Sequence, residues 1–282
     1  MEAIQNKKEK IDLFVITHYD ADHIKAMVSI LERLSVKDRR RLIKKVWFNA
    51  TKVGFYGNDQ QLSAQDATKV SKLLIESEIA WVSELKVGTK EKISDNLILE
   101  LIDGGDIYKP TGEGKLLGSE KNDWNTSFEE LEKYLDDDVL DTSKTNAQSA
   151  IIVAHIHGKN ILLPGDATPG KLLKALDGYR KEEPMVFDMV KLPHHGSYKN
   201  ITQQILSRYE CSDYIISTNG VKYCHPNKKM MVKVFNWGKR IEGRQLIFHF
   251  NYFEELFNRL NISDADKYHY NFECDGRREF EL

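Results

Sequence analysis

The sequence predicts an α/β layered fold, and three of its features support that prediction. Short apolar runs rich in β-formers, such as IDLFVI at 11–16, end in polar loops. Segments with apolar residues at helical spacing follow several of these runs. This alternation of strands and helices extends through most of the 282 residues, a length that suits one large domain. We therefore expect a single domain over residues 1–282.

Composition, charge and cysteine content exclude several classes of protein. The chain is 41% hydrophobic and 30% charged with a net charge of -2, so any contact with nucleic acid must use a local patch. Its 3 cysteines form no CxxC pair, which argues against a disulfide framework and favours a reducing compartment. The polar N-terminus shows no signal peptide, and no apolar run approaches the ~20 residues of a membrane span. We expect a cytoplasmic protein without membrane contact.

The first part of the chain predicts strands and helices in turn. Residues 11–16 are typical of a buried strand, and Asp22 is expected at the N-cap of the helix that follows. The apolar residues of that helix are Ile24, Met27, Val28, Leu31 and Leu34. The elements expected next are a strand at 46–50, a helix at about 64–79, and strands near 81–86 and 97–102.

Residues 103–146 are less regular than the segments on either side of them. They contain several glycines, a short acidic helix in FEELEKYL and the acidic tract DDDVLD. We interpret the segment as an insertion that lies over one face of the domain. A solvated loop is the favoured description of it.

Regular elements return after the insertion. SAIIVAHIHGKNILLPGDA predicts a hairpin that turns at 157–160. The elements expected after it are a helix near 169–178, a strand in FDMVKL, a helix near 201–208, a strand in DYIIST, a strand in RQLIFHF, a helix near 253–260 and a hairpin that turns at Asp275-Gly276.

The segment THYDADH, directly after the first strand, gathers four metal-ligand side chains in one turn. They are His18, Asp20, Asp22 and His23. Alternate residues of a turn that leaves a strand project to one side, and the last two can swing round as the helix begins. One turn could therefore serve two adjacent cations. Imidazole suits zinc, manganese or iron, and carboxylates add harder oxygen ligands.

Later strand ends carry side chains that could complete such a site. They are Asp166 in LLPGDAT, His194 and His195 in KLPHHGS, and His225 in CHPN. Loops at strand ends are where α/β sheets place their active sites. The remaining histidines lack this position, so we expect structural roles for His155, His157, His249 and His269.

The ordered set THYDADHI, NAQSAIIV, LLPGDAT, KLPHHGS and CHP resembles the metallo-β-lactamase-fold hydrolases. Within them it looks most like the hydrolase domain of the competence protein ComEC and its relatives. The similarity extends from about residue 11 to about residue 250. It implies an αββα sandwich with the metal site at one edge of the sheets, and two divalent cations, Zn²⁺ or Mn²⁺.

The resemblance also implies roles for individual residues. The metal ligands would be His18, Asp20, Asp22, His23, Asp166, His194 and His225, with His195 as the alternative to His194. A hydroxide held by the cations would attack the substrate, with Asp22 orienting it and His195 or His225 protonating the leaving oxygen. Possible substrate contacts are Lys191, Ser197, Asn146 and Ser149, although a turn hydroxyl and a surface lysine explain two of them equally well.

Three departures from the family pattern have consequences. Asp20 stands where most members have a second histidine, and Asn146, Gln148 and Ser149 occupy the region of a missing middle histidine. The first cation would then be weakly held, and more oxygen ligands shift the preference from zinc toward manganese. Only ten polar residues precede IDLFVI, where the family has about two strands. We therefore expect a lost upstream segment, a partner segment or a homo-oligomer to cover that sheet edge.

The ComEC-like resemblance predicts a phosphodiesterase or nuclease that acts on DNA or another phosphodiester. The basic run RRRLIKK at 39–45 and the pair Lys228–Lys229 could bind phosphates, although a solvated helix face explains the first run better. One alternative is a lactonase- or lactamase-like hydrolase of a small ester or amide. Another is a non-catalytic, metal-binding interaction subunit.

Overall fold

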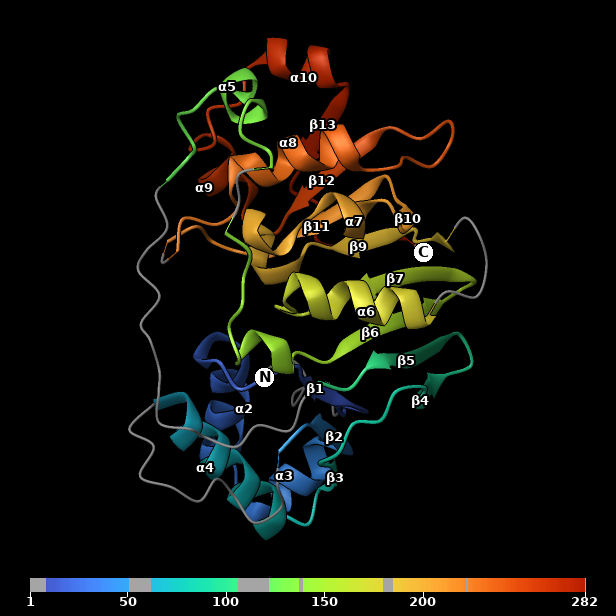
Figure 1. Cartoon of the computed structure of the whole chain (residues 1–282). Coiled ribbons are helices and arrows are strands. Elements are labelled where there is room, and N and C mark those ends of the chain that lie inside the picture. Colours follow the sequence, from blue (N-terminus) through green and yellow to red (C-terminus); the bar gives the residue numbers. More distant parts are fainter. Residues whose placement is uncertain are drawn as a thin grey trace.

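The computed structural model describes residues 9–50, 62–105, 122–136, 139–179, 185–221 and 223–281. Its helices and strands form a mixed α/β fold, which confirms the α/β part of the predicted fold class (Figure 1). No helix among these residues has the length and apolar character needed to cross a membrane.

A small sheet contains the first three strands, which all run parallel. They are β1 (Phe14–Ile16), β2 (Lys45–Phe48) and β3 (Ala80–Val82), in the order β1-β2-β3. The helices between them are α2 (Ala21–Arg33), α3 (Val36–Leu42) and α4 (Leu62–Glu76). Strand β1 pairs with β2 alone among the described strands, so it lies at a sheet edge. The expectation that a partner segment or a second copy covers this edge stays a prediction.

A larger sheet has the strand order β13-β12-β11-β9-β7-β6-β5-β4. Its antiparallel part consists of β4 (Lys90–Ser94), β5 (Leu97–Asp103), β6 (Ile151–Ile156) and β7 (Lys159–Leu163). Its parallel part continues from β7 through β9 (Met189–Lys191), β11 (Asp213–Ile216), β12 (Leu246–Phe250) and β13 (Phe272–Asp275). Strands β8 (Met185–Val186) and β10 (Tyr209–Glu210) form a separate pair.

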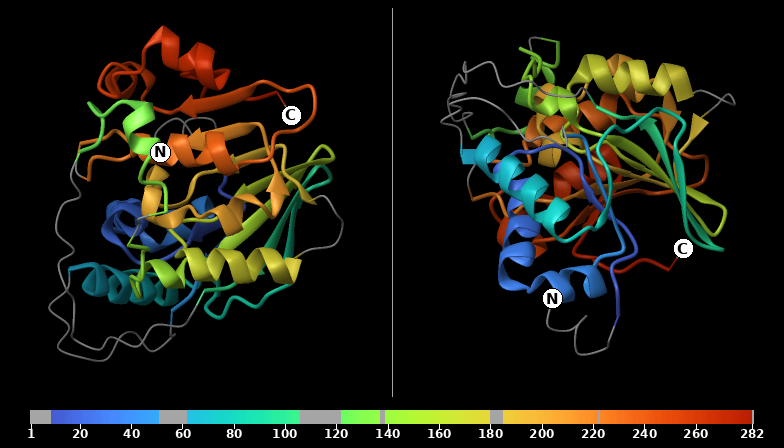
Figure 2. Two further views of the ribbon diagram at one scale, coloured as in Figure 1. Left: turned by 45° about the horizontal axis from the view of Figure 1, so that its top comes forward. Right: turned by 90° about the horizontal axis from the view of Figure 1, so that it is seen from below.

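The remaining helices are short or cover the large sheet. They are α5 (Phe128–Glu132), α6 (Pro169–Tyr179), α7 (Gln203–Leu206), α8 (Lys228–Trp237), α9 (Phe253–Phe257) and α10 (Asp264–Tyr270), with 3-10 turns η1 (Asn146–Gln148), η2 (Pro193–Gly196) and η3 (Tyr198–Asn200). Figure 2 shows α6 and the α2–α4 group on opposite sides of the strands.

The alternation of side chains along the strands explains the layers. In β2, Phe48 packs into the core beneath α2 and α4, whereas Trp47 points the other way. In the large sheet, Leu101 and Ile152 meet Trp47 in a core between the two sheets. Their sequence neighbours face the opposite core, under the helices of the large sheet. Because successive strand residues point to opposite faces, each sheet buries two apolar faces and is covered on both sides.

The β6–β7 hairpin is confirmed, and its turn is tight. His157 and Gly158 have φ angles of 49° and 79°. Positive φ at both central residues is typical of a type I′ turn, which matches the twist of the two strands. The hairpin sets the register between the two strands that flank the candidate site.

The described part of the insertion is not a solvated loop. Trp124 and Phe128 are buried in the core of the large sheet. The Asp123 carboxylate accepts backbone N–H bonds of 3.0 and 2.8 Å from Lys228 and Lys229, so it caps the N-terminus of α8. Residues 106–121 lie outside the described residues. The expectation of a solvated loop was wrong for the segment around α5, because aromatic side chains anchor it.

Two local predictions were also wrong. Helix α2 begins two residues earlier than expected, with Asp20 rather than Asp22 at its N-cap. The Asp275-Gly276 pair does not turn a hairpin, because β13 lies parallel to β12 and ends there. Strand β4 was not expected at all, since its charged sequence KEKIS suits an exposed edge rather than a buried strand.

His249 links three strands of the large sheet through pH-dependent hydrogen bonds, in agreement with its predicted structural role. Its ring is buried, with Nδ1 2.7 Å from Asp275 and Nε2 3.0 Å from Asp213. Burial opposes the charged ring, but the two carboxylates outweigh it and raise the pKa of His249. A raised pKa contributes stability that is present below the unfolded-state pKa and lost as pH rises through the folded-state pKa.

We therefore expect His249→Gln to lower the free energy of unfolding more at about pH 5.5 than at about pH 9, on either side of an ordinary imidazole. Urea denaturation at both pH values measures this difference. The matched control is His269→Gln on exposed α10, which should change neither value. An equal loss at both pH values for His249→Gln would contradict the role of the charged ring.

Candidate metal centre

The loops that carry the predicted motifs meet at one edge of the two sheets. Strands β1, β7, β9 and β11 all end at this edge, and β6 begins there because it runs antiparallel to β7. The backbone amide of Ala150, just before β6, donates to the carbonyl of Thr17, just after β1, at 3.0 Å. This bond joins the small sheet to the large one directly beside the site.

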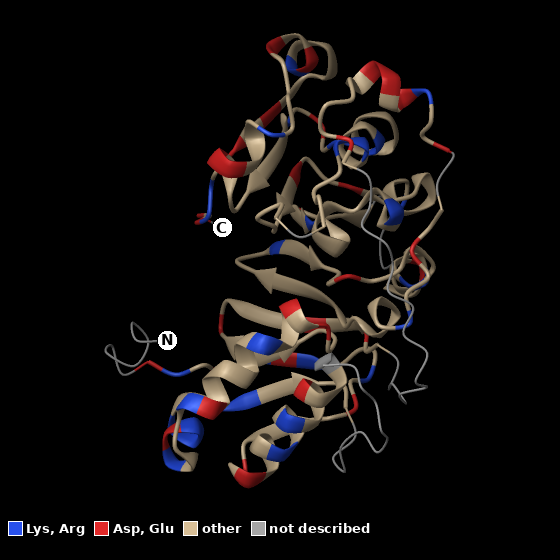
Figure 3. Ribbon diagram, turned by 90° about the vertical axis from the view of Figure 1, so that its left-hand side faces the viewer, with Lys and Arg blue, Asp and Glu red and all other residues tan. Residues whose placement is uncertain are grey.

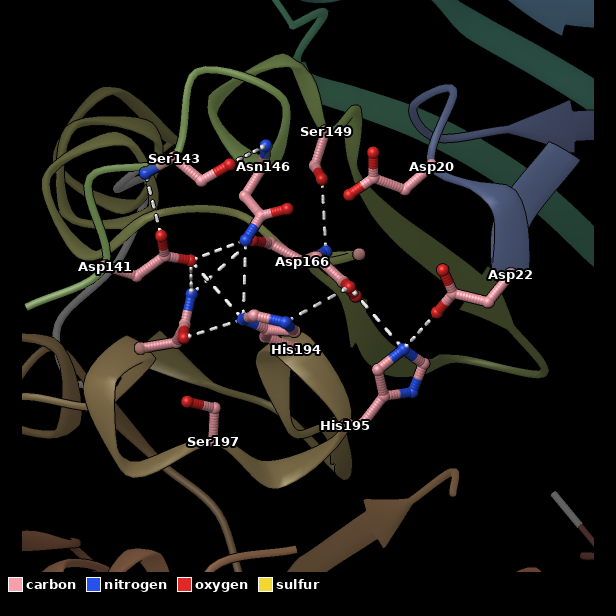
Figure 4. A network of polar contacts seen from close by, with 12 residues as sticks. Asp20, Asp22, Asp141, Ser143, Asn146, Ser149, Asp166, His194, His195 and Ser197 are labelled. Atoms are coloured by element: carbon pink, nitrogen blue, oxygen red, sulfur yellow. Dashed lines mark hydrogen bonds and ion pairs between the residues drawn. The ribbon is translucent and has the colours of Figure 1, made fainter. Parts of the chain in front are cut away.

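Asp166 stands at the centre of the group (Figure 4). Its side chain is 4% exposed, and its Oδ2 lies 3.2 Å from Nε2 of His23, 3.5 Å from Nε2 of His195 and 4.0 Å from Nε2 of His194. Burial alone would raise its pKa, but His23, Lys191 and His195 outweigh that effect and hold the pKa of Asp166 well below its ordinary value. The carboxylate is therefore ionised and surrounded by nitrogen atoms from two separate loops.

Four donors around this carboxylate are compact enough for one cation. Ligand atoms of Asp22, His23, Asp166 and His195 all lie within 4.8 Å of one another. Two donors on one cation at ~2.1 Å each can be up to ~4.2 Å apart. A slight closure of this group would therefore satisfy the coordination distances of zinc or manganese.

Several buried polar atoms of the site lack hydrogen-bond partners, and a metal ion would explain them. Nε2 of His18, Nε2 of His23 and Oδ1 of Asp166 are buried and lack a hydrogen bond with good geometry. A buried polar atom without such a bond costs about 1–3 kcal/mol. Three of them at one point are accounted for if each donates its lone pair to a cation.

Contacts on the far side of the histidine rings favour the same outcome. Nδ1 of His195 lies 2.6 Å from the carbonyl oxygen of Ser217, so it donates its proton there. In the neutral ring this leaves the lone pair on Nε2, which faces Asp166 and Asp22. The hydroxyl of Thr17 lies 3.2 Å from Nδ1 of both His18 and His23. A hydroxyl can accept as well as donate, so it is compatible with a lone pair on Nε2 of each ring.

His18 and Asp20 form a second group of donors beside the first. Nε2 of His18 is 3.6 Å from Oδ2 of Asp20, and its ring centre is 4.1 Å from that of His23. The Oγ atom of Ser149 lies 3.2 Å from Nδ1 of His18 and also accepts the backbone N–H of Asp166 at 3.1 Å. Ser149 therefore links the first and third motifs rather than facing a substrate.

The aspartates at the start of α2 are not used as helix caps. Asp20 holds the N-cap position, but its side chain makes no capping hydrogen bond. Asp22 instead points to His195, with 2.9 Å between Oδ2 and Nε2. Partial burial opposes its charge, yet His195 and His23 hold the pKa of Asp22 below its ordinary value. The positive end of the helix dipole also favours an anion here.

The HHG loop is held in a strained conformation. His194 and His195 have φ angles of 45° and 57°, and Gly196 follows at 87°. A non-glycine residue in this left-handed region costs about 1–3 kcal/mol. Two consecutive histidines carry this cost here, and the result is that both rings face Asp166.

Asp141 and Asn200 belong to the site but carry no signal in the sequence. The Oδ2 atom of Asp141 accepts from the side-chain amides of Asn146 and Asn200 at 2.7 and 2.8 Å and lies 3.4 Å from Nδ1 of His194. Burial would raise the pKa of Asp141, but its bonds to His194 and Asn146 keep it lowered. Asp141 was hidden at the end of the tract DDDVLD, where its neighbours suggest a solvated loop.

His225 lies behind His194, with 5.1 Å between the ring centres. Its burial, together with the nearby rings of His194 and His195, lowers the pKa of His225 to about 3. The ring is therefore neutral at physiological pH. A neutral ring suits a ligand or a hydrogen-bond donor better than the predicted acid.

Two predicted substrate contacts have structural partners. The ammonium of Lys191 lies 3.2 Å from the carbonyl oxygen of Leu192 and 3.9 Å from Oδ1 of Asp166. It therefore places a positive charge beside the buried carboxylate of Asp166. Burial lowers the pKa of Lys191 despite the nearby carboxylates. Ser197 is fully buried and accepts a backbone N–H from Lys199. Asn146 donates to Asp141, as described above, and its Nδ2 atom lies 3.4 Å from Nδ1 of His194.

Comparisons with known proteins give little further information. No known protein family matches the chain, and no curated protein matches it. One solved structure, described as a "putative metal-dependent hydrolase" from Parabacteroides distasonis ATCC 8503, aligns with 86% of this chain and 77% of its own. The two share 12% sequence identity with a TM-score of 0.38.

Gly165 is needed where the Asp166 loop passes the first motif. It has φ +58°, and a Cβ atom there would lie 3.2 Å from Cβ of Thr17 and 3.1 Å from Cβ of Ser149. We expect Gly165→Ala to lower the free energy of unfolding by about 1–2 kcal/mol and to weaken metal uptake, because the added methyl group displaces Asp166.

The matched control is Gly158→Ala in the β6–β7 turn. Gly158 has a similar positive φ of +79° but open space around its Cβ position. It should lose comparable stability while metal uptake stays unchanged. Calorimetry and metal titration measure the two effects. Equal metal uptake by both variants would show that the packing of Gly165 does not position Asp166.

Proposed function

We propose that the chain is a metal-dependent hydrolase of the metallo-β-lactamase fold that cleaves phosphodiesters with the help of two divalent cations. One observation carries this proposal: Asp166, Asp22, His23 and His195 come from three distant segments and bring their ligand atoms within 4.8 Å of one another. The substrate class comes from the motif resemblance described above.

The layers support the assignment to this fold. Two sheets face each other across the core that contains Trp47, and helices cover their outer faces. Each predicted motif lies at the same edge of these sheets, in the loop where the resemblance requires it. This arrangement agrees with an αββα sandwich whose metal site lies at the sheet edge.

The donors divide into a stronger and a weaker set. Asp22, His23, Asp166 and His195 would hold the first cation, and His194, whose Nε2 lies 4.0 Å from Oδ2 of Asp166, would join them. His18 and Asp20, with the other oxygen of Asp166, would hold the second. The second set has fewer donors, so we expect it to bind more weakly. The mixture of nitrogen and carboxylate oxygen donors is compatible with either zinc or manganese.

When bound, the cations would polarise a phosphoryl oxygen and make a water molecule more acidic. The chain's own residues prepare the site for that chemistry. Asp22 stays ionised and offers an acceptor for a proton of the attacking water. The carbonyl of Ser217 fixes the ring of His195. Lys191 offsets the charge of Asp166 from below, and Ser149 holds the Asp166 loop in place.

The basic residues considered as phosphate contacts have other roles. Arg39 is buried and donates to the carbonyl of Leu31 at 2.6 Å, and Arg40 donates to the carbonyl of Ser77 at 2.6 Å. These bonds attach α3 to the helices beside it. Lys228 is buried with its ammonium 4.8 Å from the ring centre of Phe128. Figure 3 shows basic and acidic residues interspersed along the ribbon.

A nucleic-acid substrate would therefore depend on the cations more than on a basic surface. Helix α3 begins just after the C-terminal end of α2, whereas Asp22 lies in the first turn of α2. The length of α2 separates these two ends by about 20 Å. We infer that RRRLIKK takes no part in substrate binding.

We expect Asp166→Asn to abolish hydrolysis of bis(p-nitrophenyl) phosphate and DNA by chelator-treated protein reloaded with Mn²⁺ or Zn²⁺. The variant removes the negative charge that His23 and His195 face from two different loops. The matched control is Asp95→Asn, an exposed turn residue, which should keep full activity. Activity retained by Asp166→Asn would exclude this site. If the wild-type protein cleaved a lactone or a small ester but no phosphodiester, the substrate would be a small ester rather than a phosphodiester.

The two donor sets predict a divided stoichiometry. After dialysis against a small excess of Mn²⁺, we expect wild type to retain two equivalents and Asp20→Asn to retain one. His23→Gln should lose the tightly held equivalent. Elemental analysis by mass spectrometry measures both. If Asp20→Asn still retained two equivalents, the second cation could not depend on the His18–Asp20 pair.

A further inference from the structure

Beyond the ligands themselves, we propose that Asp141 is a positioning residue: with Asn200 it fixes the tautomer and direction of His194, so that Nε2 of this ring joins Asp166 on a cation. The inference rests on the metal site of the proposed function. It assigns a role to two side chains that no motif contains. The amide of Asn200 has only one orientation that its neighbours allow.

The Nδ2 atom of Asn200 faces acceptors only. It lies 2.8 Å from Oδ2 of Asp141, 3.0 Å from the carbonyl oxygen of Ala167 and 3.5 Å from that of Asp166. An amide nitrogen donates and cannot accept, so these partners fix which end of the amide is nitrogen. The Oδ1 atom must then be the end that lies 3.1 Å from Nδ1 of His194.

This orientation decides the proton on His194. The nearest neighbour of Nδ1 is an acceptor, Oδ1 of Asn200 at 3.1 Å, and Oδ2 of Asp141 is a second acceptor at 3.4 Å. A donor, Nδ2 of Asn146, also lies 3.4 Å away, but it donates to Oδ2 of Asp141 at the shorter distance of 2.7 Å. Nδ1 therefore carries a hydrogen and donates it. In the neutral ring Nε2 then holds the lone pair, and it points toward Oδ2 of Asp166, 4.0 Å away (Figure 4). Two acceptors at that separation can share one cation at ~2.1 Å from each.

The partners of Asp141 among the described residues are donors, and this makes a carboxylate necessary. Its Oδ1 accepts the backbone N–H of Ser143 at 2.8 Å. Its Oδ2 accepts from Asn146 and Asn200 and faces Nδ1 of His194. An asparagine at this position has nearly the same shape but turns an NH₂ group against at least one of these donors. The change removes the acceptor without leaving a cavity.

The comparison with His195 shows why His194 needs this support. Nδ1 of His195 is fixed by a backbone carbonyl, which no substitution can remove. Nδ1 of His194 instead relies on the side chains of Asn200 and Asp141, while the two backbones are strained alike, at φ 45° and 57°. Contacts that orient a ligating histidine typically contribute about 10- to 100-fold to metal affinity. Asp141 is the residue on which this contribution depends.

We expect Asp141→Asn to weaken binding of Zn²⁺ about 10- to 100-fold in a competition titration with a chromogenic chelator. The matched control is Asp177→Asn, which removes an exposed carboxylate from α6 and should bind Zn²⁺ as wild type does. Circular dichroism in chelator establishes that both variants are folded. Unchanged Zn²⁺ affinity of folded Asp141→Asn would overturn the inference.

A second measurement needs no variant at position 141. Long-range ¹H–¹⁵N correlation spectra of [¹⁵N]histidine-labelled wild-type protein report which ring nitrogen carries the proton, with His194→Gln identifying the signal. In zinc-loaded protein we expect the Nδ1–H form for His194, and a ring protonated on Nε2 would overturn the inference. If wild type takes up no Zn²⁺, the proposed function fails. The spectrum of metal-free protein at alkaline pH then tests the tautomer by itself.

Discussion

The structure depends on one constraint, the ionised carboxylate of Asp166 in a buried position. An ion removed from water costs several kcal/mol unless partners compensate for it. The partners here are His23 from the loop after β1, His195 from the loop after β9 and Lys191 from the end of β9. These loops are far apart in the sequence, and they meet because the strands before them end at the same edge of the two sheets. The sandwich of two sheets is therefore also the frame of the site.

The backbone near Asp166 is shaped by the same requirement. Gly165 takes a left-handed conformation between the Thr17 and Ser149 side chains, and two histidines take it at a cost in the HHG loop. Residues in strained conformations persist where the surrounding structure holds them firmly. The contacts of Asp141 and Asn200 with His194 provide that hold on one side. The hydrogen bond from His195 to the carbonyl of Ser217 provides it on the other.

The strands and the strand-end ligands could be predicted because both depend on local sequence. Short apolar runs identify β1, β6 and β7, and polar residues directly after such runs must emerge at a sheet edge. The position of Asp166 beside His195 follows because β7 and β9 are parallel neighbours, whereas His23 reaches the pair from the other sheet. The structural role of His249 was predicted because this histidine does not follow a strand end, and its hydrogen bonds to Asp213 and Asp275 agree with that role.

Features that depend on distant partners could not be predicted. Asp141 ends an acidic tract that suggests solvent, and only the fold shows that Asn146, Asn200 and His194 surround it. Asp22 is a good N-cap residue by its position, but contact with His195 draws its side chain away and the helix begins earlier. The Asp275-Gly276 pair suggests a hairpin, yet β13 follows two helices and adds to the sheet in parallel. Lys191 and Ser197 follow a strand end but face inward.

Crystals grown with Mn²⁺ offer the most direct measurement, since anomalous diffraction locates manganese without reference to activity. The account predicts a strong anomalous peak in contact with Oδ2 of Asp166 and Nε2 of both His23 and His195, at ~2.0–2.3 Å from each. A peak bound elsewhere on the chain, with these three side chains still in contact only with one another, would contradict it.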